Sequence, residues 1–302
     1  MFASLIAAVA LSGVVQEPLL PVLVGYVPAW SYQEVPASAY EQVTDVIAFS
    51  VEPTRDGKIE SKDLPERVLS DLNDLKAKHG FRLLLAIGGW ERSSGFATVS
   101  ADVAKREKFA REVKTWVEKY RLDGIDLDWE HPKNVDEARS YAALARSIKR
   151  AIGKDKLVTA AMAAWQEYPP ELIAALDRLH LMSYDHPGEH STRDQAIRDV
   201  DAVAFKGMPK EKIVLGVPFY GRNVEKFEEA KSARELLQDS TRQGDRVGSF
   251  FFNSEATLRE KARIVKEQKL GGVMVWELSQ DTKDGSLIRA LREALGRLGD
   301  GS

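Results

Sequence analysis

Apolar segments of strand length alternate with amphipathic segments along most of this chain. The apolar segments cover residues 22–27, 43–50, 81–87, 122–130, 157–162, 179–184, 213–218 and 272–276. Between them, apolar residues recur at helical spacing, as in Phe109, Val113 and Val117, or in residues 256–268, which Ser254 could cap. Eight alternations of strand and helix predict an α/β fold, the (β/α)8 or TIM barrel, as a single domain over residues 21–298.

The longest departure from this alternation covers Asn223 to Asn253, between the seventh and eighth expected strands. It mixes Glu, Lys, Ser and Gly around a short helical pattern at 233–237. We interpret it as an elaborated loop rather than a second domain.

The fourth apolar segment carries an unusual set of acidic residues. Asp126, Asp128 and Glu130 share one face of the expected strand, with successive Cα atoms of the set about 6.6 Å apart. The other face holds the apolar residues Ile125, Leu127 and Trp129. Like charges this close resist joint ionisation, so at least one carboxyl should keep a proton near neutral pH, as a general acid requires.

This acidic strand has two other interpretations. Carboxylate clusters also bind Mg²⁺ or Ca²⁺, and an acidic strand can lie in solvent at a sheet edge. The apolar second face argues against a solvated edge and suits a barrel strand covered by helices. In a barrel Glu130 lies at the carboxyl end of its strand, just before His131 and Pro132, where barrel active sites are found. Asp123 has the opposite parity, so we expect a structural role for it.

Composition excludes several functions. With a net charge of −3 and Lys and Arg dispersed along the chain, no nucleic-acid partner is expected. Cysteine is absent, which excludes disulfides and thiol nucleophiles.

The N-terminus resembles a signal peptide. About fifteen uncharged residues there are typical of a signal-peptide core and are too short to span a membrane, so residues 1–16 predict a secreted or periplasmic protein. No Lys or Arg precedes Leu5, which leaves a cytoplasmic location as the alternative.

The segment Asp-Gly-Ile-Asp-Leu-Asp-Trp-Glu at 123–130 resembles the Asp-x-x-Asp-x-Asp-x-Glu signature of glycoside hydrolase family 18, the chitinases and their relatives. The resemblance spans residues 25 to 280, and its motifs fall on separate strands in the family's order. These further motifs are Gly25-Tyr26, Ala48-Phe49, Gly88-Gly89-Trp90, Met182-Ser183-Tyr184-Asp185, Gly216 to Arg222, and Gly271 to Glu277.

The resemblance implies substrate-assisted hydrolysis, for which this family is an exception to the two-carboxylate scheme. Glu130 would protonate the glycosidic oxygen, while the substrate's own 2-acetamido oxygen attacks the anomeric carbon with net retention. Asp128 would orient the acetamido nitrogen and share a proton with Asp126. Tyr184 would hold the acetamido oxygen in place.

The same resemblance implies a set of substrate-binding residues. These are Tyr26, Phe49, Trp90, Met182, Asp185, Tyr220, Arg222 and Trp276. Trp276 would form the floor under a sugar ring, Tyr26 and Met182 would line the pocket near Asp126, and Trp90 would stack on the leaving-group side. For Trp276 and Met182 barrel packing is the alternative, and for Arg222 a surface ion pair.

Two departures from the family pattern affect these expectations. The family's third strand commonly carries Ser-x-Gly-Gly, but Ala86 stands here in place of the serine. Asp126 would then accept one hydrogen bond fewer and bind a proton more readily, unless Tyr26 or water compensates. The segment from Asn223 to Asn253 is too short for the full α+β insertion of deep-groove members, so a more open cleft is expected.

The histidines invite a metal interpretation, since His186 and His190 have i, i+4 spacing. Pro187 and Gly188 intervene, however, so no helix aligns the two rings. We expect neither a metal nor a cofactor.

The sequence therefore predicts a monomeric retaining hydrolase that acts on β-1,4-linked N-acetylglucosamine, most simply chitin or its oligomers. An endo-β-N-acetylglucosaminidase acting on N-glycans or peptidoglycan is the alternative within the same class. A chitin-binding lectin on the same barrel is the alternative of another class, and Glu130 argues against it because such lectins lose the acid.

Overall fold

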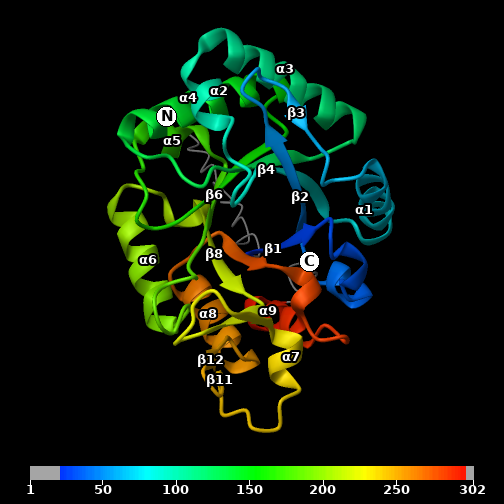
Figure 1. The fold of residues 1–302 in the computed structure, drawn as a ribbon, viewed down its shortest axis with the longest axis vertical. Coiled ribbons are helices and arrows are strands. Elements are labelled where there is room, and N and C mark those ends of the chain that lie inside the picture. The colour runs from blue at the N-terminus through cyan, green and yellow to red at the C-terminus, as the bar shows by residue number, and fades with distance from the viewer. Residues whose placement is uncertain (1–20, 297–302) are drawn as a thin grey trace, which may run out of the picture.

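Eight parallel strands close into a barrel in the computed structural model, which describes residues 21–296 (Figure 1). The strands are β1 (Val22–Pro28), β2 (Asp45–Pro53), β4 (Arg82–Gly88), β5 (Gly124–Asp128), β6 (Leu157–Met162), β7 (Arg178–Leu181), β8 (Ile213–Pro218) and β13 (Gly272–Trp276). Their order is β1-β13-β8-β7-β6-β5-β4-β2, and pairing of β1 with β2 closes the barrel. The eight strands expected from the sequence are confirmed, three of them with the same bounds.

Helices surround the barrel, as Figure 1 shows. They are α1 (Glu66–His79), α2 (Phe96–Ala101), α3 (Val103–Lys119), α4 (Val135–Ile152), α5 (Pro170–Ala175), α6 (Arg193–Phe205), α8 (Glu255–Glu267) and α9 (Ser286–Leu295). Short 3₁₀ turns are η1 (Tyr32–Glu34), η2 (Ala37–Glu41), η3 (Lys210–Lys212) and η4 (Leu278–Gln280). Ser254 stands at the N-cap of α8 without a side-chain capping bond, and Asp245 instead accepts from its backbone N–H and from the Thr257 hydroxyl.

The alternation of side chains along each strand divides the apolar residues into two clusters. Leu23 and Val27 of β1 face outward and pack with the helices in the larger cluster. Val24 and Tyr26 face inward and join the smaller cluster inside the barrel. Because parallel strands buried on both faces read as continuous apolar segments, this packing explains the sequence pattern.

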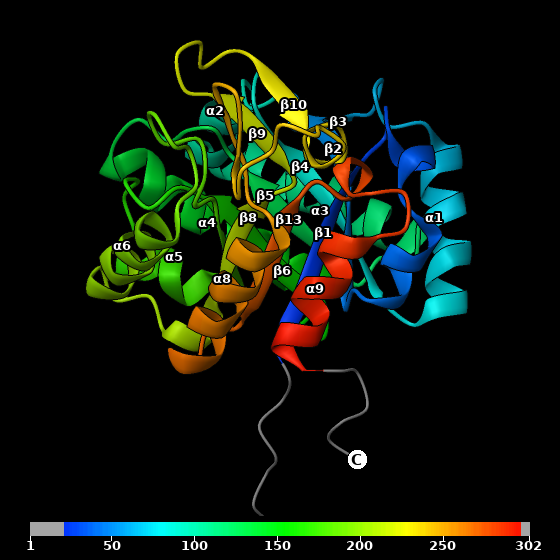
Figure 2. The same ribbon diagram turned by 90° about the horizontal axis from the view of Figure 1, so that it is seen from below.

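The segment after β8 forms a small antiparallel sheet. Its strands β9 (Tyr220–Asn223), β10 (Ala230–Ser232), β11 (Arg246–Val247) and β12 (Phe250–Phe251) are ordered β10-β9-β12-β11, with α7 (Ala233–Leu237) between β10 and β11. Figure 2 shows β9 and β10 at the same end of the barrel as β3 (Ile59–Glu60), which pairs with the end of β2. The short helix was predicted at these residues, but the sheet was not.

Two glycines at the end of β4 allow β5 and β2 to approach. Gly88 has φ +103°, and a Cβ there would lie 2.2 Å from the Asp128 carbonyl oxygen. Gly89 has φ +109°, and a Cβ there would lie 2.4 Å from the Phe49 ring. Both positions therefore require glycine, and their close packing fixes the end of β5 on which the acidic residues lie.

The structure bears differently on the expected signal peptide and on membrane-spanning helices. The proposed signal peptide, residues 1–16, lies outside the described residues, so export stays a prediction. Among residues 21–296, no helix is long and apolar enough to cross a membrane.

Candidate active site

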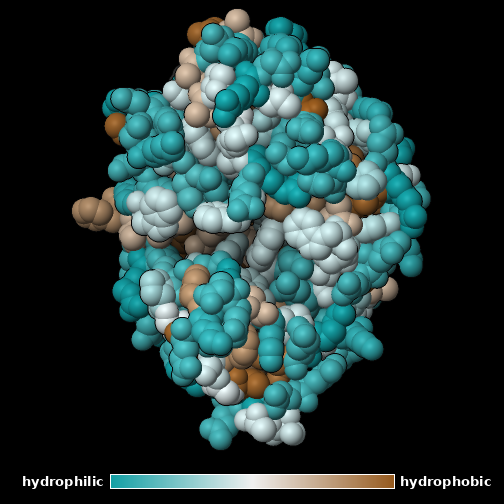
Figure 3. All heavy atoms as spheres, viewed as in Figure 1, coloured by the Kyte–Doolittle hydropathy of each residue, from teal (hydrophilic) through white to brown (hydrophobic). Residues whose placement is uncertain are grey.

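A cleft of about 1050 Å³ opens where the carboxyl ends of the barrel strands meet the small antiparallel sheet. Figure 3 shows that face of the molecule hollowed near its middle, with mostly hydrophilic residues around it. The expected site residues that line the cleft are Phe49, Trp90, Glu130, Met182, Tyr184, Asp185, Tyr220, Arg222 and Trp276. They come from segments far apart in the sequence, and the closed barrel brings them together.

The acidic strand runs from the barrel interior toward this cleft. Asp126 is fully buried, Asp128 is almost fully buried, and Glu130 follows β5 and lines the cleft. Asp123 stands just before the strand, where it accepts from the Leu83 backbone N–H and forms an ion pair with Lys76. The alternation predicted from the sequence therefore separates three acids near the cleft from one that ties β5 to its neighbours.

Asp126 accepts side-chain hydrogen bonds from two different strands and lies close to a histidine on a third. The Tyr26 hydroxyl donates to its Oδ2 at 2.5 Å, and the Thr159 hydroxyl donates to its Oδ1 at 2.5 Å. The Nδ1 atom of His180 lies 3.0 Å from the same Oδ1. The expectation that Ala86 leaves Asp126 short of a donor is thus corrected, because Thr159 adds a second donor to that of Tyr26.

Tyr26 needs a second correction, because it does not line the cleft. Its side chain is 1% exposed and lies beneath Phe49 and Trp276, whose rings it contacts edge-on at 6.3 and 5.5 Å. Alternation places its ring inside the barrel, but the depth at which it lies keeps it from a ligand. Its hydroxyl acts on Asp126 instead.

Asp128 has few partners for a buried carboxylate. Its Oδ1 is buried and has no hydrogen bond among the described residues. Burial, together with the negative charges of Glu130 and Asp126, raises the pKa of Asp128 well above its usual range. This carboxyl therefore holds a proton more readily than an exposed one, as the crowding of acids along the strand predicts.

Glu130 is held at the cleft by neighbouring loops. Its backbone N–H donates to the Ser93 hydroxyl at 3.0 Å, and its Oε2 lies 3.4 Å from His131 Nε2. Burial, reinforced by the negative charge of Asp185, raises the pKa of Glu130 to about 7. A carboxyl with this pKa retains its proton through mildly acidic pH, which a general acid requires.

We expect the activity of this site to fall as pH rises through the pKa of Glu130. The protonated form is the active one, so kcat/KM should be level below pH 7 and drop about tenfold per pH unit above it. A kcat/KM profile from pH 5 to 9 with a neutral substrate checks this. An alkaline limb beginning near pH 4.5 would show that the acid is not perturbed.

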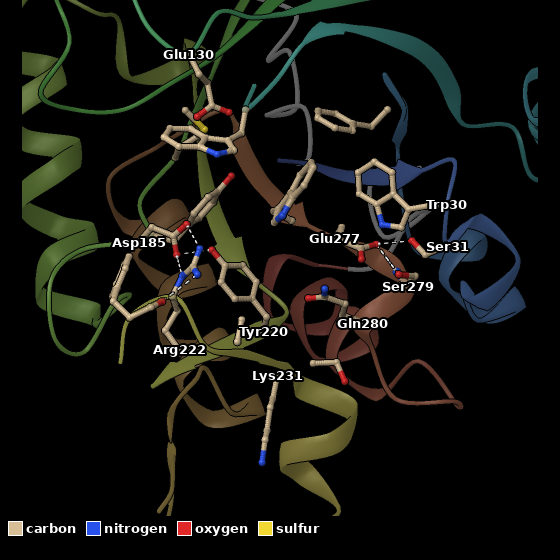
Figure 4. Close-up of a pocket in the computed structure, with 18 of the residues that line it drawn as sticks. Trp30, Ser31, Glu130, Asp185, Tyr220, Arg222, Lys231, Glu277, Ser279 and Gln280 are labelled. Atoms are coloured by element: carbon tan, nitrogen blue, oxygen red, sulfur yellow. Dashed lines mark hydrogen bonds and ion pairs between the residues drawn. The ribbon is translucent and has the colours of Figure 1, made fainter. Parts of the chain in front are cut away.

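Asp185 lines the cleft just beyond the end of β7 and is heavily bonded. It accepts the Tyr220 hydroxyl at 2.7 Å and a two-pronged contact from Arg222, at 2.7 Å from Nε and 2.9 Å from Nη2 (Figure 4). Although burial alone would raise it, hydrogen bonds from Arg222, His190 and Tyr220 hold the pKa of Asp185 well below its usual range. Arg222 thus both lines the cleft and forms the ion pair that was its alternative interpretation.

The apolar floor of the cleft is aromatic. Phe49 and Trp276 meet edge-on with ring centroids 4.7 Å apart, and Trp276 is partly exposed toward the cleft. Tyr184 and Met182 lie beside them, and burial raises the pKa of the Tyr184 hydroxyl well above 10. The Tyr184 hydroxyl therefore stays protonated and is able to donate a hydrogen bond to a ligand.

The sequence interpretation missed several residues that line the cleft. Trp30 and Trp165 are 61% and 66% exposed there, and Arg92 lies with its guanidinium carbon 5.9 Å from the Trp30 ring centroid. Glu277 accepts hydrogen bonds from the backbone and hydroxyl of Ser279 on the far wall (Figure 4). Trp30 and Trp165 each follow the end of a predicted strand, and this position was the signal that could have found them.

No metal site is apparent in the described part of the chain. No group of three or more His, Asp or Glu side chains within residues 21–296 is arranged to hold an ion. His186 contacts Asp199 at 2.9 Å, and His190 lies 3.5 Å from Asp185.

Comparison with known proteins agrees with this geometry. The Glycosyl hydrolases family 18 model matches residues 22–281. Chitinase 63 of Streptomyces plicatus is 27% identical over an alignment covering 82% of this chain and 51% of that protein. Chitinase A1 of Niallia circulans is 26% identical, with 70% and 42% covered. The chain thus spans about half the length of these curated relatives.

Solved structures share the fold. A chitinase from Bacteroides thetaiotaomicron superposes with a TM-score of 0.84 at 24% identity, over 94% of this chain and 99% of that one. A mutant GH18 chitinase from Cycas revoluta, solved with (GlcNAc)4, gives a TM-score of 0.80 at 22% identity, over 91% and 100%. At these identities the likeness extends to the barrel architecture alone.

Proposed function

The chain belongs to the glycosyl hydrolases family 18, and from that premise we propose that it is a retaining hydrolase of β-1,4-linked N-acetylglucosamine glycans, with chitin or its oligomers as substrate. The observation that carries the proposal is the position of Glu130. It is a carboxyl with a pKa near 7 at the end of a buried acidic strand, and it faces a cleft with an aromatic floor.

The acid and the acetamido group divide the reaction between them. Glu130 donates its proton to the glycosidic oxygen, so the leaving sugar departs as an alcohol. The 2-acetamido oxygen of the substrate closes on the anomeric carbon to give an oxazolinium ion. Glu130, now a carboxylate, takes a proton from the water that opens this ion from the same face, which gives net retention.

The carboxylates around Glu130 favour this route over a covalent glycosyl–enzyme. Both oxygens of Asp185 are bound by Arg222, and Tyr220 also donates to Oδ1, so neither oxygen is free to attack a sugar. Asp128 is buried behind Glu130, and burial with the charges of Glu130 and Asp126 raises its pKa. A nucleophile supplied by the substrate removes the need for a second free carboxylate.

Two residues orient the acetamido group in this scheme. The protonated hydroxyl of Tyr184 donates to the acetamido oxygen, and Asp128 accepts from its N–H. Both side chains are packed in the barrel mouth, so the bound geometry is fixed before reaction. The sugar ring lies against Trp276, which exposes part of its face at the floor of the cleft.

The acetamido group gives a direct test of this route. A chitotrioside reporter should release its leaving group, whereas the matching cellotrioside, with hydroxyls at C2, should react at least about a thousand-fold more slowly because it lacks the internal nucleophile. The measurement is kcat/KM for both reporters at pH 6. Comparable rates would refute acetamido participation.

The substrate is tested by product analysis on three materials side by side. Chitin oligomers, high-mannose glycan and peptidoglycan each present linked N-acetylglucosamine, and we expect fastest release of β-anomeric products from the chitin oligomers. Faster cleavage of either other material would move the assignment to that glycan. Binding without cleavage of all three would make the protein a lectin.

A further inference from the structure

A fully buried lysine is bonded to the loop that follows β7. Lys261 of α8 is 0% exposed, and its Nζ donates to the Ser191 carbonyl at 2.9 Å, the Ser191 hydroxyl at 2.7 Å and Asn253 Oδ1 at 2.8 Å. An ammonium has three hydrogens, so each of them has an acceptor. Lys261 thereby joins α8 to the end of the small-sheet segment and to the loop between β7 and α6, which carries Tyr184 and Asp185.

No ion pair holds Lys261 in this place. The acids whose charges act on it, Asp245 and Asp199, are bonded to other donors, and no carboxylate among residues 21–296 forms an ion pair with it. Burial lowers the pKa of Lys261 to about 7, because an ammonium is costly where water is excluded. Its hydrogen bonds offset this cost only while the acceptors stay in place, so they tie Lys261 to the loop.

Ser191 links Lys261 to the backbone just before Tyr184. Its hydroxyl accepts from the ammonium and gives its own hydrogen to the Ser183 carbonyl at 2.8 Å. Ser183 and Ser191 are both fully buried, so water does not replace either bond. The contacts therefore run without a break from Lys261 to the peptide that joins Ser183 to Tyr184.

Tyr184 and Asp185 depend on this link to different degrees. Asp185 is held separately by Tyr220 and Arg222. The Tyr184 hydroxyl forms no hydrogen bond with the residues that the structure describes, so the position of its ring depends on packing and on the backbone at Ser183. A shift of that backbone would accordingly displace Tyr184 more than Asp185.

We propose that Lys261 is a positioning residue that, through the Ser191 hydroxyl, holds the Ser183 carbonyl and so fixes the place of Tyr184 at the cleft. This role rests on the proposed function, in which the Tyr184 hydroxyl holds the acetamido oxygen. Lys261 touches no substrate, since it is fully buried and does not line the cleft.

Replacing Lys261 by Met tests this role, because Met has a similar length and no hydrogen to donate. Lys212 provides the matched control, since its Nζ also donates to backbone carbonyls, those of Ile173 and Leu176, but does not line the cleft. Both Lys→Met substitutions should lower Tm. At pH 6 and well below either Tm, only Lys261→Met should lower kcat for the chitotrioside reporter, by about tenfold, with KM within about threefold of wild type. A merely structural role predicts a lower Tm with kcat unchanged.

A second variant breaks the link at its middle. Ser191→Ala removes the hydroxyl between Lys261 and Ser183 and leaves the ammonium two of its acceptors, so it should lower kcat by a similar factor. Because the two residues act along one series of contacts, the double variant should lose no more than about twofold beyond the larger single loss. Losses that multiply would overturn the link through Ser191. If Lys261→Met does not fold, wild-type kcat in Ser191→Ala would overturn it as well.

The place of Tyr184 is measurable without activity. In protein containing 3-fluorotyrosine, the ¹⁹F resonance of Tyr184, identified by its loss in Tyr184→Phe, should shift or broaden in Lys261→Met and Ser191→Ala and stay unchanged in Lys212→Met. An unmoved resonance in a folded Lys261→Met would overturn the proposal. If the wild type cleaves no acetamido glycan, the proposed function fails, whereas the ¹⁹F spectra still decide whether Lys261 fixes Tyr184.

Discussion

Replacing Glu130 by Gln lowers kcat for a chitotrioside reporter by about a thousand-fold or more, because the amide has the shape of the acid but no proton to give. Binding of a chitin oligomer should stay within a few-fold of wild type, since the aromatic floor and the Asp185–Arg222–Tyr220 cluster are unchanged. Reporter kinetics measure the first effect and isothermal titration calorimetry the second.

Asp123 provides the matched control, because it belongs to the same acidic segment and has the opposite parity. Asp123→Asn removes the ion pair with Lys76 and weakens the bond to the Leu83 N–H, so it should lower Tm while leaving kcat within about twofold. Turnover by Glu130→Gln at a rate comparable to wild type would withdraw the acid role from Glu130.

Replacing Asp128 by Asn should make the protein more stable and much less active. The folded state raises the pKa of Asp128 above its unfolded value, so folding takes up a proton that the unfolded chain has lost above about pH 4. The cost of this uptake grows as pH rises from the unfolded pKa toward the folded one. Asn has no proton to bind, so its Tm should match wild type at pH 4 and exceed it by a few degrees at pH 7 to 8.

The loss of activity in Asp128→Asn has a different origin. An amide cannot carry the changing charge that Asp128 provides beside the acetamido N–H, so kcat should fall about a hundredfold.

Asp45 is the matched control for stability, because it is also buried but is bonded by Thr44, Arg82 and Arg178. Asp45→Asn should lower Tm at pH 7. If Asp128→Asn instead lowers Tm at pH 7, the cost of proton uptake that we assign to Asp128 on folding is contradicted.

The barrel was predictable because each strand is buried on both faces and each helix on one, so the apolar pattern marks their limits. The small sheet was not, since β11 and β12 are two residues long and carry no periodicity. Its pairing depends on contacts such as that of Phe251 with Arg222, which are distant in sequence.

The acids were predictable for a similar reason, because a strand alternates two faces and Asp126, Asp128 and Glu130 share one. Their supports were not. Thr159 is the single polar residue of β6 and His180 lies between two leucines of β7, and only closure of the barrel sets them close to Asp126. Tyr26 was expected at the cleft because alternation gives a side chain's face but not its depth.

The three indoles that stand at the cleft mouth, Trp30, Trp90 and Trp165, are between 61% and 69% exposed and make up half of the six tryptophans in the chain. An indole in water emits at longer wavelength than one covered by a sugar, so this protein contains its own optical reporter. Occupancy of the cleft is therefore readable in an unlabelled, catalytically inert variant by the blue shift of its emission, and replacing the indoles one at a time would map which part of the mouth a glycan covers.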